Sequence, residues 1–328
     1  MPGLRVSVAI PIYNEVQVLP ELLRRVAAVL DGVPAGPHEI VLVDDGSRDG
    51  SREALLKAAA SEPRLVVVAL SRNFGHQAAL SAALDHAGGD AVILMDGDLQ
   101  DPPEAIPDFV RTHLEGYDVV YAQRVRRKEG WLLRLCYATF YRMLARLSNV
   151  QLPVDAGDFG LMSRRVVDQL RNAPERHRYL RGLRAWAGYR QIGIAVERSA
   201  RAAGESKYSL AKLVALACDG FFSFSVAPLR AAALLGVSAI VLSSLFALYS
   251  IVAKFLLHQS PQGFTALILV MVFLSGTNLL FLGLLGEYLG RVYEEVKRRP
   301  LYVVDQVVRG TARDSGAPPA EVVAELFR

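Results

Sequence analysis

Short apolar runs in the first third of the chain predict buried strands. These runs, which are rich in β-branched residues, cover Val6–Ile10, Ile40–Val43, Leu65–Ala69 and Ala91–Met95. Stretches whose apolar residues repeat at helical spacing lie between or after the runs, over residues 19–30, 77–86 and 105–115. Strands that alternate with helices in this way predict right-handed βαβ units and a mostly parallel sheet. The expected fold class is therefore α/β.

The apolar pattern changes near the C-terminus, where two long uncharged runs predict membrane helices. Ala231–Ala253 and Phe264–Gly286 contain no charged residue. Each would span about 34 Å at 1.5 Å per residue, compared with about 30 Å for the hydrocarbon core of a bilayer. Pro261 and Gly263 break the short stretch between them, so a transmembrane helical hairpin is predicted. Two buried core helices are the alternative.

The charges beside these runs predict the orientation of the hairpin. Its outer ends are flanked by Arg230, Arg291, Lys297, Arg298 and Arg299. Lys254 and His258 lie near the short loop. The positive-inside rule therefore places the large N-terminal region in the cytoplasm, in a multi-pass protein of the inner (plasma) membrane. Residues 1–30 lack a charged n-region followed by an uninterrupted apolar h-region, so no signal peptide is expected.

Two further segments predict helices that lie along the membrane surface. Trp131–Val150 is rich in aromatic residues and leucine but is interrupted by arginines, including Arg142 and Arg146. An apolar face with arginines at headgroup level is typical of an interfacial helix, although an ordinary packing helix is the alternative. Leu210–Val226 is the second candidate.

These elements give the expected division of the chain, whose 328 residues allow roughly two domains. The large N-terminal domain covers 1–208 and includes the interfacial helix over 131–150, and a juxtamembrane helix covers 209–228. The membrane helices cover 229–257 and 264–290. A cytoplasmic tail over 291–328 contains a short strand near Leu301–Val308. A hydrophobic content of 52% agrees with a membrane anchor.

Basic residues gather in one region, although the net charge of +4 is modest. They are Arg124, Arg126, Arg127, Lys128, Arg134, Arg142 and Arg146. Nucleic acid is one class of partner for such a cluster, but beside a membrane anchor an anionic lipid or a lipid phosphate is favoured. No nucleic-acid partner is therefore expected. Cys136 and Cys218 have no metal-ligand spacing and are expected to pack as inert thiols.

The fourth apolar run ends in two carboxylates, Asp96 and Asp98. In open α/β sheets ligands bind beyond the carboxyl ends of the strands, so these side chains should face a crevice. Carboxylate oxygens suit Mg²⁺ and Mn²⁺, and Mg²⁺ is usually held by one or two carboxylates together with substrate phosphates. The pair therefore predicts a clamp for a metal–diphosphate, with an ordinary Asp-Gly turn as the alternative.

Polar residues also follow the first two strands, at the same predicted edge of the sheet. Pro11–Glu15 follows the first run and Asp44–Ser47 follows the second. A carboxylate there can accept hydrogen bonds from a base or from ribose hydroxyls. A helix entry and a glycine turn are the simpler alternatives. The chain has no Gly-x-Gly-x-x-Gly after a strand and no Gly-Lys-Ser/Thr, so the dinucleotide-binding and P-loop classes lack support.

Together these motifs resemble family 2 glycosyltransferases, and among them the polyprenyl-phosphate glycosyltransferases. The resemblance covers residues 5–305 and rests on VAIPIYNE, VLVDDGSRDGS, LSRNFGHQAAL, LMDGDLQDPPE, DAGDFGLMSRR, RAAGESKYS and the terminal hairpin. The chain has Asp-Gly-Asp where the family usually has Asp-Ala-Asp, which keeps both carboxylates. The resemblance implies a GT-A fold, Rossmann-like with a mostly parallel sheet. The group includes bactoprenol glucosyltransferases, dolichol-phosphate mannose synthases and the aminoarabinose transferase of lipid A modification.

The resemblance also implies roles for individual residues. The nucleotide pocket would be lined by Pro11, Tyr13, Glu15, Asp44, Asp45 and Asp96. The metal, Mg²⁺ or Mn²⁺, would be held by Asp96, Asp98 and Gln100. The acceptor phosphate would be bound by Arg124, Arg134 and Ser206. A loop that closes over the phosphates would carry Arg201, Ser206 and Lys207, with a plain surface turn as the alternative reading of that stretch.

Asp155 and Asp158 lie in the segment that resembles the catalytic motif of the family, where an aspartate is usually the general base. The acceptor phosphate has a second pKa of about 6 and is largely deprotonated at neutral pH. A base contributes little when the nucleophile has no proton to lose. Asp158 is expected to be essential, either as that base or because it orients the acceptor or the sugar hydroxyls.

The implied reaction is a single displacement that inverts the anomeric carbon. A phosphate oxygen of polyprenyl (undecaprenyl) phosphate attacks C1 of a sugar on a nucleoside diphosphate. UDP-glucose is the first choice because Ser71–His76 resembles the bactoprenol glucosyltransferases. Galactose, N-acetylglucosamine, mannose and aminoarabinose stay open. Relatives of this kind form homo-oligomers, so a homo-oligomer is expected.

Three rival functions remain. A processive polysaccharide synthase lacks support because Gln-x-x-Arg-Trp and further membrane spans are absent from the sequence. A sugar-1-phosphate nucleotidyltransferase should carry a Gly-rich N-terminal phosphate loop, which Val8–Tyr13 is not. A non-enzymatic membrane scaffold is the alternative from a different class.

Overall fold

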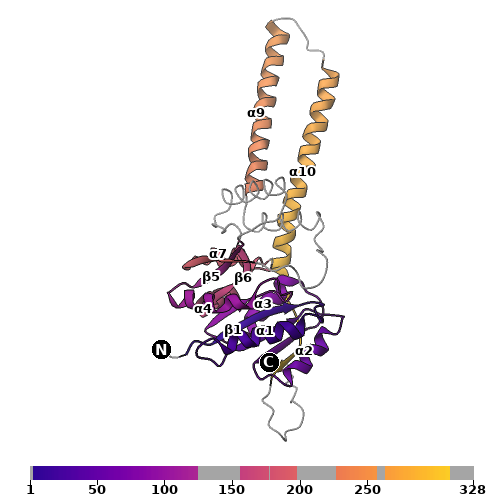
Figure 1. Ribbon diagram of the computed structural model, residues 1–328. Coiled ribbons are helices and arrows are strands. Elements are labelled where there is room, and N and C mark those ends of the chain that lie inside the picture. The colour runs from indigo at the N-terminus through magenta and orange to yellow at the C-terminus, as the bar shows by residue number, and fades with distance from the viewer. Residues whose placement is uncertain (1–2, 125–155, 177, 198–226, 257–262, 311–328) are drawn as a thin grey trace. The chain divides into compact units, whose positions relative to one another are not determined.

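The computed structural model describes residues 3–124, 156–176, 178–197, 227–256 and 263–310 (Figure 1). The chain divides into two compact units. One is formed by Met1–Ala145, Val150–Leu210 and Pro300–Arg328, and the other by Arg146–Asn149 and Ala211–Arg299. The interfacial helix predicted over 131–150 and nearly all of the juxtamembrane helix predicted over 209–228 lie outside the described residues.

The first unit is built on a mixed sheet, which has eight strands among the described residues in the order β7-β5-β6-β4-β1-β2-β3-β8. The strands are β1 (Val6–Ile12), β2 (Glu39–Asp44), β3 (Leu65–Leu70), β4 (Ala91–Leu94), β5 (Val119–Arg124), β6 (Ala156–Ser163), β7 (Gln191–Val196) and β8 (Val304–Arg309). β1 pairs in parallel with β2 and β4, β2 with β3, and β5 with β7. β6 runs antiparallel between β4 and β5, and β8 runs antiparallel to β3. The predicted α/β class and mostly parallel sheet are confirmed.

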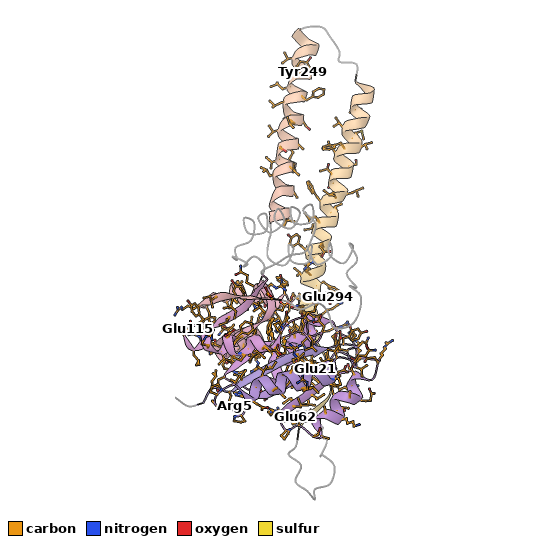
Figure 2. The ribbon with its side chains drawn as sticks, viewed as in Figure 1. Arg5, Glu21, Glu62, Glu115, Tyr249 and Glu294 are labelled. Atoms are coloured by element: carbon orange, nitrogen blue, oxygen red, sulfur yellow. The ribbon has the colours of Figure 1, made fainter. Side chains whose placement is uncertain are left out.

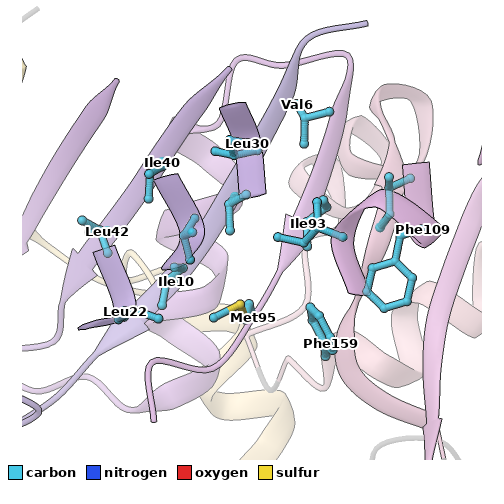
Figure 3. Close-up of a cluster of buried hydrophobic side chains, with 14 of the residues drawn as sticks. Val6, Ile10, Leu22, Leu30, Ile40, Leu42, Ile93, Met95, Phe109 and Phe159 are labelled. Atoms are coloured by element: carbon cyan, nitrogen blue, oxygen red, sulfur yellow. The ribbon is translucent and has the colours of Figure 1, made fainter. Parts of the chain in front are cut away.

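Helices cover both faces of this sheet. One face carries α1 (Leu19–Asp31), α2 (Ser51–Ala59) and α4 (Ile106–Leu114), which follows the short turn η1 (Pro103–Ala105). The other face carries α3 (His76–His86), α6 (Arg164–Asn172) and α7 (Leu180–Trp186). Successive strand residues point to opposite faces, so Ile10 joins the first cluster (Figure 3) and Ala9 joins the second. Every residue of β1 is therefore buried, which explains its unbroken apolar sequence.

The runs predicted from sequence match β1 to β4 closely, and the three predicted helices match α1, α3 and α4. The tail strand is confirmed as β8, and it pairs with β3 of its own chain. The sequence does not predict β5, β6, β7, α2, α6 or α7. β6 contains two glycines and a charged residue, so its apolar pattern is interrupted.

The second unit contains two long helices, α9 (Ala227–Leu256) and α10 (Phe264–Lys297), which cover the two predicted membrane runs. In the described part of the chain one helix, Val270–Lys297, is long and apolar enough to cross a bilayer, and Ala232–Phe246 is a shorter apolar stretch. Apolar side chains on both helices are exposed, among them Leu234 on α9 and Phe273 on α10, at 71% and 70%. Tyr249 on α9 is exposed as well (Figure 2). Exposed apolar surface of this extent marks a membrane or protein contact. Membrane association is thus supported, while crossing by both helices as a hairpin stays a prediction.

Candidate active site

The strand register brings the carboxyl ends of β1, β2 and β4 to one edge of the sheet. Ile12 pairs with Asp44, and the N–H of Asp45 donates to the carbonyl of Ile12 at 2.9 Å. On the other side of β1, the N–H of Met95 donates to the carbonyl of Ala9 at 3.1 Å. β2 and β3 lie on one side of β1, and β4 lies on the other. This reversal of strand order creates the position where open α/β sheets bind ligands.

The antiparallel strand β6 brings Asp158 to the same edge. Leu94 at the end of β4 pairs with Gly160. Extending this antiparallel register by two residues sets Asp158 opposite Asp96. The mixed topology therefore places an acid of the DAGDF segment beside the acid pair, although the two segments are far apart in sequence.

The loops that follow β1 and β2 are joined by hydrogen bonds. The N–H of Asn14 donates to Ser47 Oγ at 3.0 Å, and the N–H of Arg48 donates to Asn14 Oδ1 at 2.8 Å. The N–H of Glu15 donates to Ser51 Oγ at 3.0 Å. Asn14 has a φ of 55°, in the left-handed region where asparagine is among the better tolerated residues. These bonds explain the polar residues after Asp45, and they fix the backbone at Asn14 and Glu15, next to Tyr13.

Asp44 and Asp45 have different roles although they are neighbours. Asp44 is fully buried, and its Oδ1 accepts from the N–H of Ser47 at 3.1 Å. Its Oδ2 is buried and has no hydrogen-bond partner among the described residues. The Asp45 oxygens accept from the N–H groups of Phe74 and Gly75 at 2.7 and 3.0 Å, and burial raises the pKa of Asp45. Asp45 therefore holds the loop that enters α3, whereas Asp44 offers an acceptor that a ligand can satisfy.

Asp96 and Asp98 lie on a tight turn after β4. The N–H of Gln100 donates to Asp98 Oδ1 at 3.1 Å. Leu99, which lies between Asp98 and Gln100, has a φ of 57° and a side chain buried in the core. A left-handed leucine is strained, and strain of this kind concentrates at functional sites. The core therefore holds this turn in a conformation that the local sequence does not favour.

His76, the first residue of α3, lies beside Asp96. Its Nε2 lies 3.5 Å from Asp96 Oδ1. Burial raises the pKa of Asp96, the nearby His76 opposes this, and the charges of Asp101, Asp158 and Asp98 raise the pKa further. Carboxylates crowded in this way favour the binding of a cation.

The residues present fit a hard divalent metal. Asp96, Asp98 and Gln100 offer carboxylate and amide oxygens, which are the ligands that Mg²⁺ and Mn²⁺ prefer. Within the described ranges no three His, Cys, Asp or Glu side chains converge as a metal-binding group. A metal here would therefore need further oxygens, such as those of a diphosphate.

Asp158 is paired with an arginine that sequence reasoning missed. Arg181 Nε and Nη2 donate to Asp158 Oδ1 and Oδ2 at 3.2 and 2.9 Å. Arg184, one turn further along α7, is buried and lies near this pair, and burial lowers its pKa to about 10. Burial alone would raise the pKa of Asp158, but Arg181, with His76 and Arg184, holds it below its usual value. Asp158 is therefore an ionised carboxylate at neutral pH.

Several predicted site residues cannot be placed. Asp155, Arg134, Arg201, Ser206 and Lys207 lie outside the described residues. Arg124 is the last residue of β5, and its side chain is not among those described. Of the other predicted residues, Pro11 is buried in β1 and Tyr13 is 44% exposed beside the loop.

Comparison with known proteins identifies the family. The chain is 42% identical over 305 residues to "Uncharacterized glycosyltransferase sll0501" of Synechocystis sp., a match that covers 93% of this chain and 96% of that protein. Residues 7–171 match the family model described as "Glycosyl transferase family 2". The chain belongs to glycosyltransferase family 2. This finding confirms the resemblance drawn from the motifs, and the protein is a glycosyltransferase enzyme.

The transferase is also similar to named members of the group. It is 37% identical over 308 residues to "SfII prophage-derived bactoprenol glucosyl transferase" of Shigella flexneri, covering 94% of this chain and 99% of that protein. Among solved structures, it is similar to glucosyl-3-phosphoglycerate synthase from Mycobacterium tuberculosis in complex with Mn²⁺, UDP-glucose and phosphoglyceric acid. That likeness has a TM-score of 0.45 and 22% identity, and it covers 66% of this chain and 77% of the other.

Proposed function

We propose that this transferase moves a hexose from a nucleoside diphosphate sugar to a polyprenyl phosphate at the cytoplasmic face of the cell membrane. The observation that carries the proposal is the meeting of Asp96, Asp98 and Asp158 at one sheet edge, in a chain that also has a long apolar helix. Relatives named bactoprenol glucosyl transferases support glucose and a lipid acceptor.

The nucleotide would bind beyond the ends of β1 and β2. Asp44 Oδ2 offers a buried acceptor for a base N–H, and the exposed ring of Tyr13 offers a stacking surface. Glu15 would reach the ribose, while Pro11 and Asp45 fix the backbone around the pocket. Because Asp44 Oδ1 already accepts from Ser47, one oxygen is left, which suits the single ring N–H of uracil better than the paired donors of guanine. This favours a UDP-sugar, and the relatives named bactoprenol glucosyl transferases make UDP-glucose the preferred donor.

The diphosphate would bind at the acid turn. Asp96, Asp98 and Gln100 would hold Mg²⁺ or Mn²⁺ there, and the bound ion would neutralise charge on the leaving diphosphate. Arg201 and Lys207, from the predicted loop, would add positive charge to the same group. The residues of the chain thus bind the donor and hold its leaving group.

The acceptor would be bound through its phosphate by Arg124, Arg134 and Ser206. A phosphate oxygen forms the new bond to C1, and the bond from C1 to the diphosphate oxygen breaks with its electron pair leaving on the nucleoside diphosphate. The configuration at C1 is inverted by this single step. The helices of the second unit, as a membrane hairpin, and the predicted interfacial helices would keep the reaction at headgroup level.

A donor panel tests the proposed function. The purified full chain is reconstituted with undecaprenyl phosphate and Mn²⁺, supplied with labelled UDP-glucose, UDP-galactose, UDP-N-acetylglucosamine or GDP-mannose, and extracted with organic solvent. We expect label in the lipid from UDP-glucose, lost with EDTA and restored by Mn²⁺. Label from GDP-mannose alone would overturn the choice of donor. No labelled lipid from any of these donors would overturn lipid glycosylation as the function of this transferase.

The variant Asp44→Asn is expected to weaken donor binding selectively. The asparagine carbonyl can still accept from Ser47, but the negative charge that faces the base is lost. Hydrogen bonds to charged groups contribute about 1.5–3 kcal/mol, so the KM for the donor should rise roughly 10- to 100-fold with kcat little changed. Initial rates over a range of donor concentration measure this. A KM equal to that of the wild type would remove Asp44 from the donor pocket.

A further inference from the structure

Asp158 contacts a residue to which no role in the reaction has yet been assigned. We propose that Arg181 is a positioning residue, which fixes the Asp158 carboxylate as an ionised hydrogen-bond acceptor for the substrates and prevents it from serving as a general base. The inference rests on the proposed function, because it concerns the same transfer step.

The first support is the geometry of the pair. Two N–H groups of Arg181 reach the two oxygens of Asp158, at 3.2 and 2.9 Å. Such a fork fixes the plane of the carboxylate as well as its position. The side chains are 22% and 18% exposed, so the pair is largely shielded but still reaches the surface of the site. Each carboxylate oxygen can accept a further hydrogen bond beside the one from Arg181, and the proposal assigns that capacity to a substrate.

The second support is the way α7 is anchored. Leu180 and Leu183 are buried against α3 and α6, and the N–H of Leu180 donates to Gln77 Oε1 at 3.0 Å. Arg184 is 3% exposed, and its Nη2 donates to the carbonyl of Gly157, next to Asp158, at 3.2 Å. Arg181 and Arg184 are three residues apart, so they share one face of the helix. A rigid, packed helix therefore presents both arginines to the segment that carries Asp158.

The third support is chemical. A general base needs a pKa near the working pH, and Arg181 acts in the opposite direction by holding the pKa of Asp158 below its usual value. The phosphate acceptor needs no base, because its second pKa is about 6. A fixed anion is useful in another way, since it can accept a hydrogen bond from a sugar hydroxyl and orient C1 for attack.

A double-mutant cycle tests the proposal with the wild type, Arg181→Met, Asp158→Asn and the double variant, all as full chains. The transfer assay uses undecaprenyl phosphate and the donor identified by the panel. Arg181→Met should lower kcat about 10- to 100-fold, because displaced catalytic groups cost rates of this order, with the donor KM nearly unchanged. In the Asp158→Asn background the same change should cost less than about threefold, because Arg181 acts through Asp158. Arg181→Lys should restore only part of the rate, since lysine cannot form the fork.

Arg25→Met is the matched control. Arg25 makes a similar fork to Glu104, at 2.9 and 2.6 Å, on the α1 face of the sheet, and its loss should leave kcat unchanged. An Arg181→Met variant that keeps wild-type kcat, or that loses as much in the Asp158→Asn background, would overturn the proposal. Thermal unfolding of the same four proteins needs no substrate. If the two substitutions shift the unfolding temperature by strictly additive amounts, the proposal would also be overturned. A failed donor panel would be a separate result that overturns the proposed function.

Discussion

Replacing Asp98 with alanine is expected to abolish sugar transfer to lipid. Asp98 is one of two carboxylates on the turn after β4, and its Oδ1 accepts from the N–H of Gln100 within that turn. Losing it would remove a ligand from the predicted cation site and leave charge on the leaving diphosphate without its counter-charge. Effects of this kind cost roughly a thousandfold or more in rate. The measurement is labelled sugar recovered in the lipid extract, together with Mn²⁺ binding to the purified variant.

Two variants show whether this loss is specific to the site. Asp98→Asn keeps an oxygen for the N–H of Gln100, and so preserves the turn while removing the charge. It should be nearly as inactive as the alanine variant. Asp108→Ala, on the exposed side of α4, removes a carboxylate that pairs with Arg111 and should keep full activity. All three proteins should remain in the membrane fraction. An active Asp98→Ala protein would contradict the proposed metal–diphosphate clamp.

Replacing Asp158 with asparagine is expected to lower kcat by about 100- to 1,000-fold, the range that one preorganised hydrogen-bonding group contributes to catalysis. The amide keeps the shape of the side chain but cannot satisfy Arg181 at both oxygens. It also leaves Arg181 and the buried Arg184 without their anion. Unfolding should therefore occur at a lower temperature than in the wild type, because an unpaired buried charge is destabilising. Rates at saturating donor, with thermal unfolding beside them, measure both effects.

The pH dependence of this variant separates two roles for Asp158. If the rate falls in acid because the acceptor phosphate gains a proton, both the wild type and Asp158→Asn should lose activity as the pH drops through about 6. If Asp158 were the general base, the acid side of the profile would disappear in the variant. If the Asp158→Asn variant still loses activity at acid pH, the role of Asp158 as a fixed anion is supported. Loss of that acid dependence would restore the base mechanism.

The sequence predicts the central strands well because they are buried on both faces. β1 to β4 are nearly unbroken runs of Val, Ile, Leu and Ala, and no other local structure suits such short runs between turns. β6 is not predicted from sequence because its composition is set by contacts with neighbouring strands. A Cβ at Gly160 would lie 2.5 Å from the carbonyl of Val120, so glycine is required by the close approach of β5. That constraint arises only when the sheet forms.

Some residues of the candidate site can be predicted from the sequence, and others cannot. Asp44, Asp96 and Asp98 can be predicted because each lies where a strand ends, and parallel strands end at a common edge. The partnership of Asp158 with Arg181 cannot be read from spacing. It depends on α7 packing against α3 through Leu180, a contact between segments far apart in the chain. The role of Asp45 as the anchor of the loop before α3 is hidden for the same reason.

The order of the strands determines which truncated forms of this enzyme keep a complete sheet. β8 is made after the apolar helices, yet it covers the outer edge of β3 inside the catalytic sheet. A fragment that stops before α9 would lack β8, and the backbone hydrogen-bonding groups at the outer edge of β3, a fully buried strand, would then be exposed. Uncovered strand edges recruit other chains and aggregate. A soluble version should therefore delete 227–297 internally and rejoin the tail by a linker, so that residues 304–309 still reach their place.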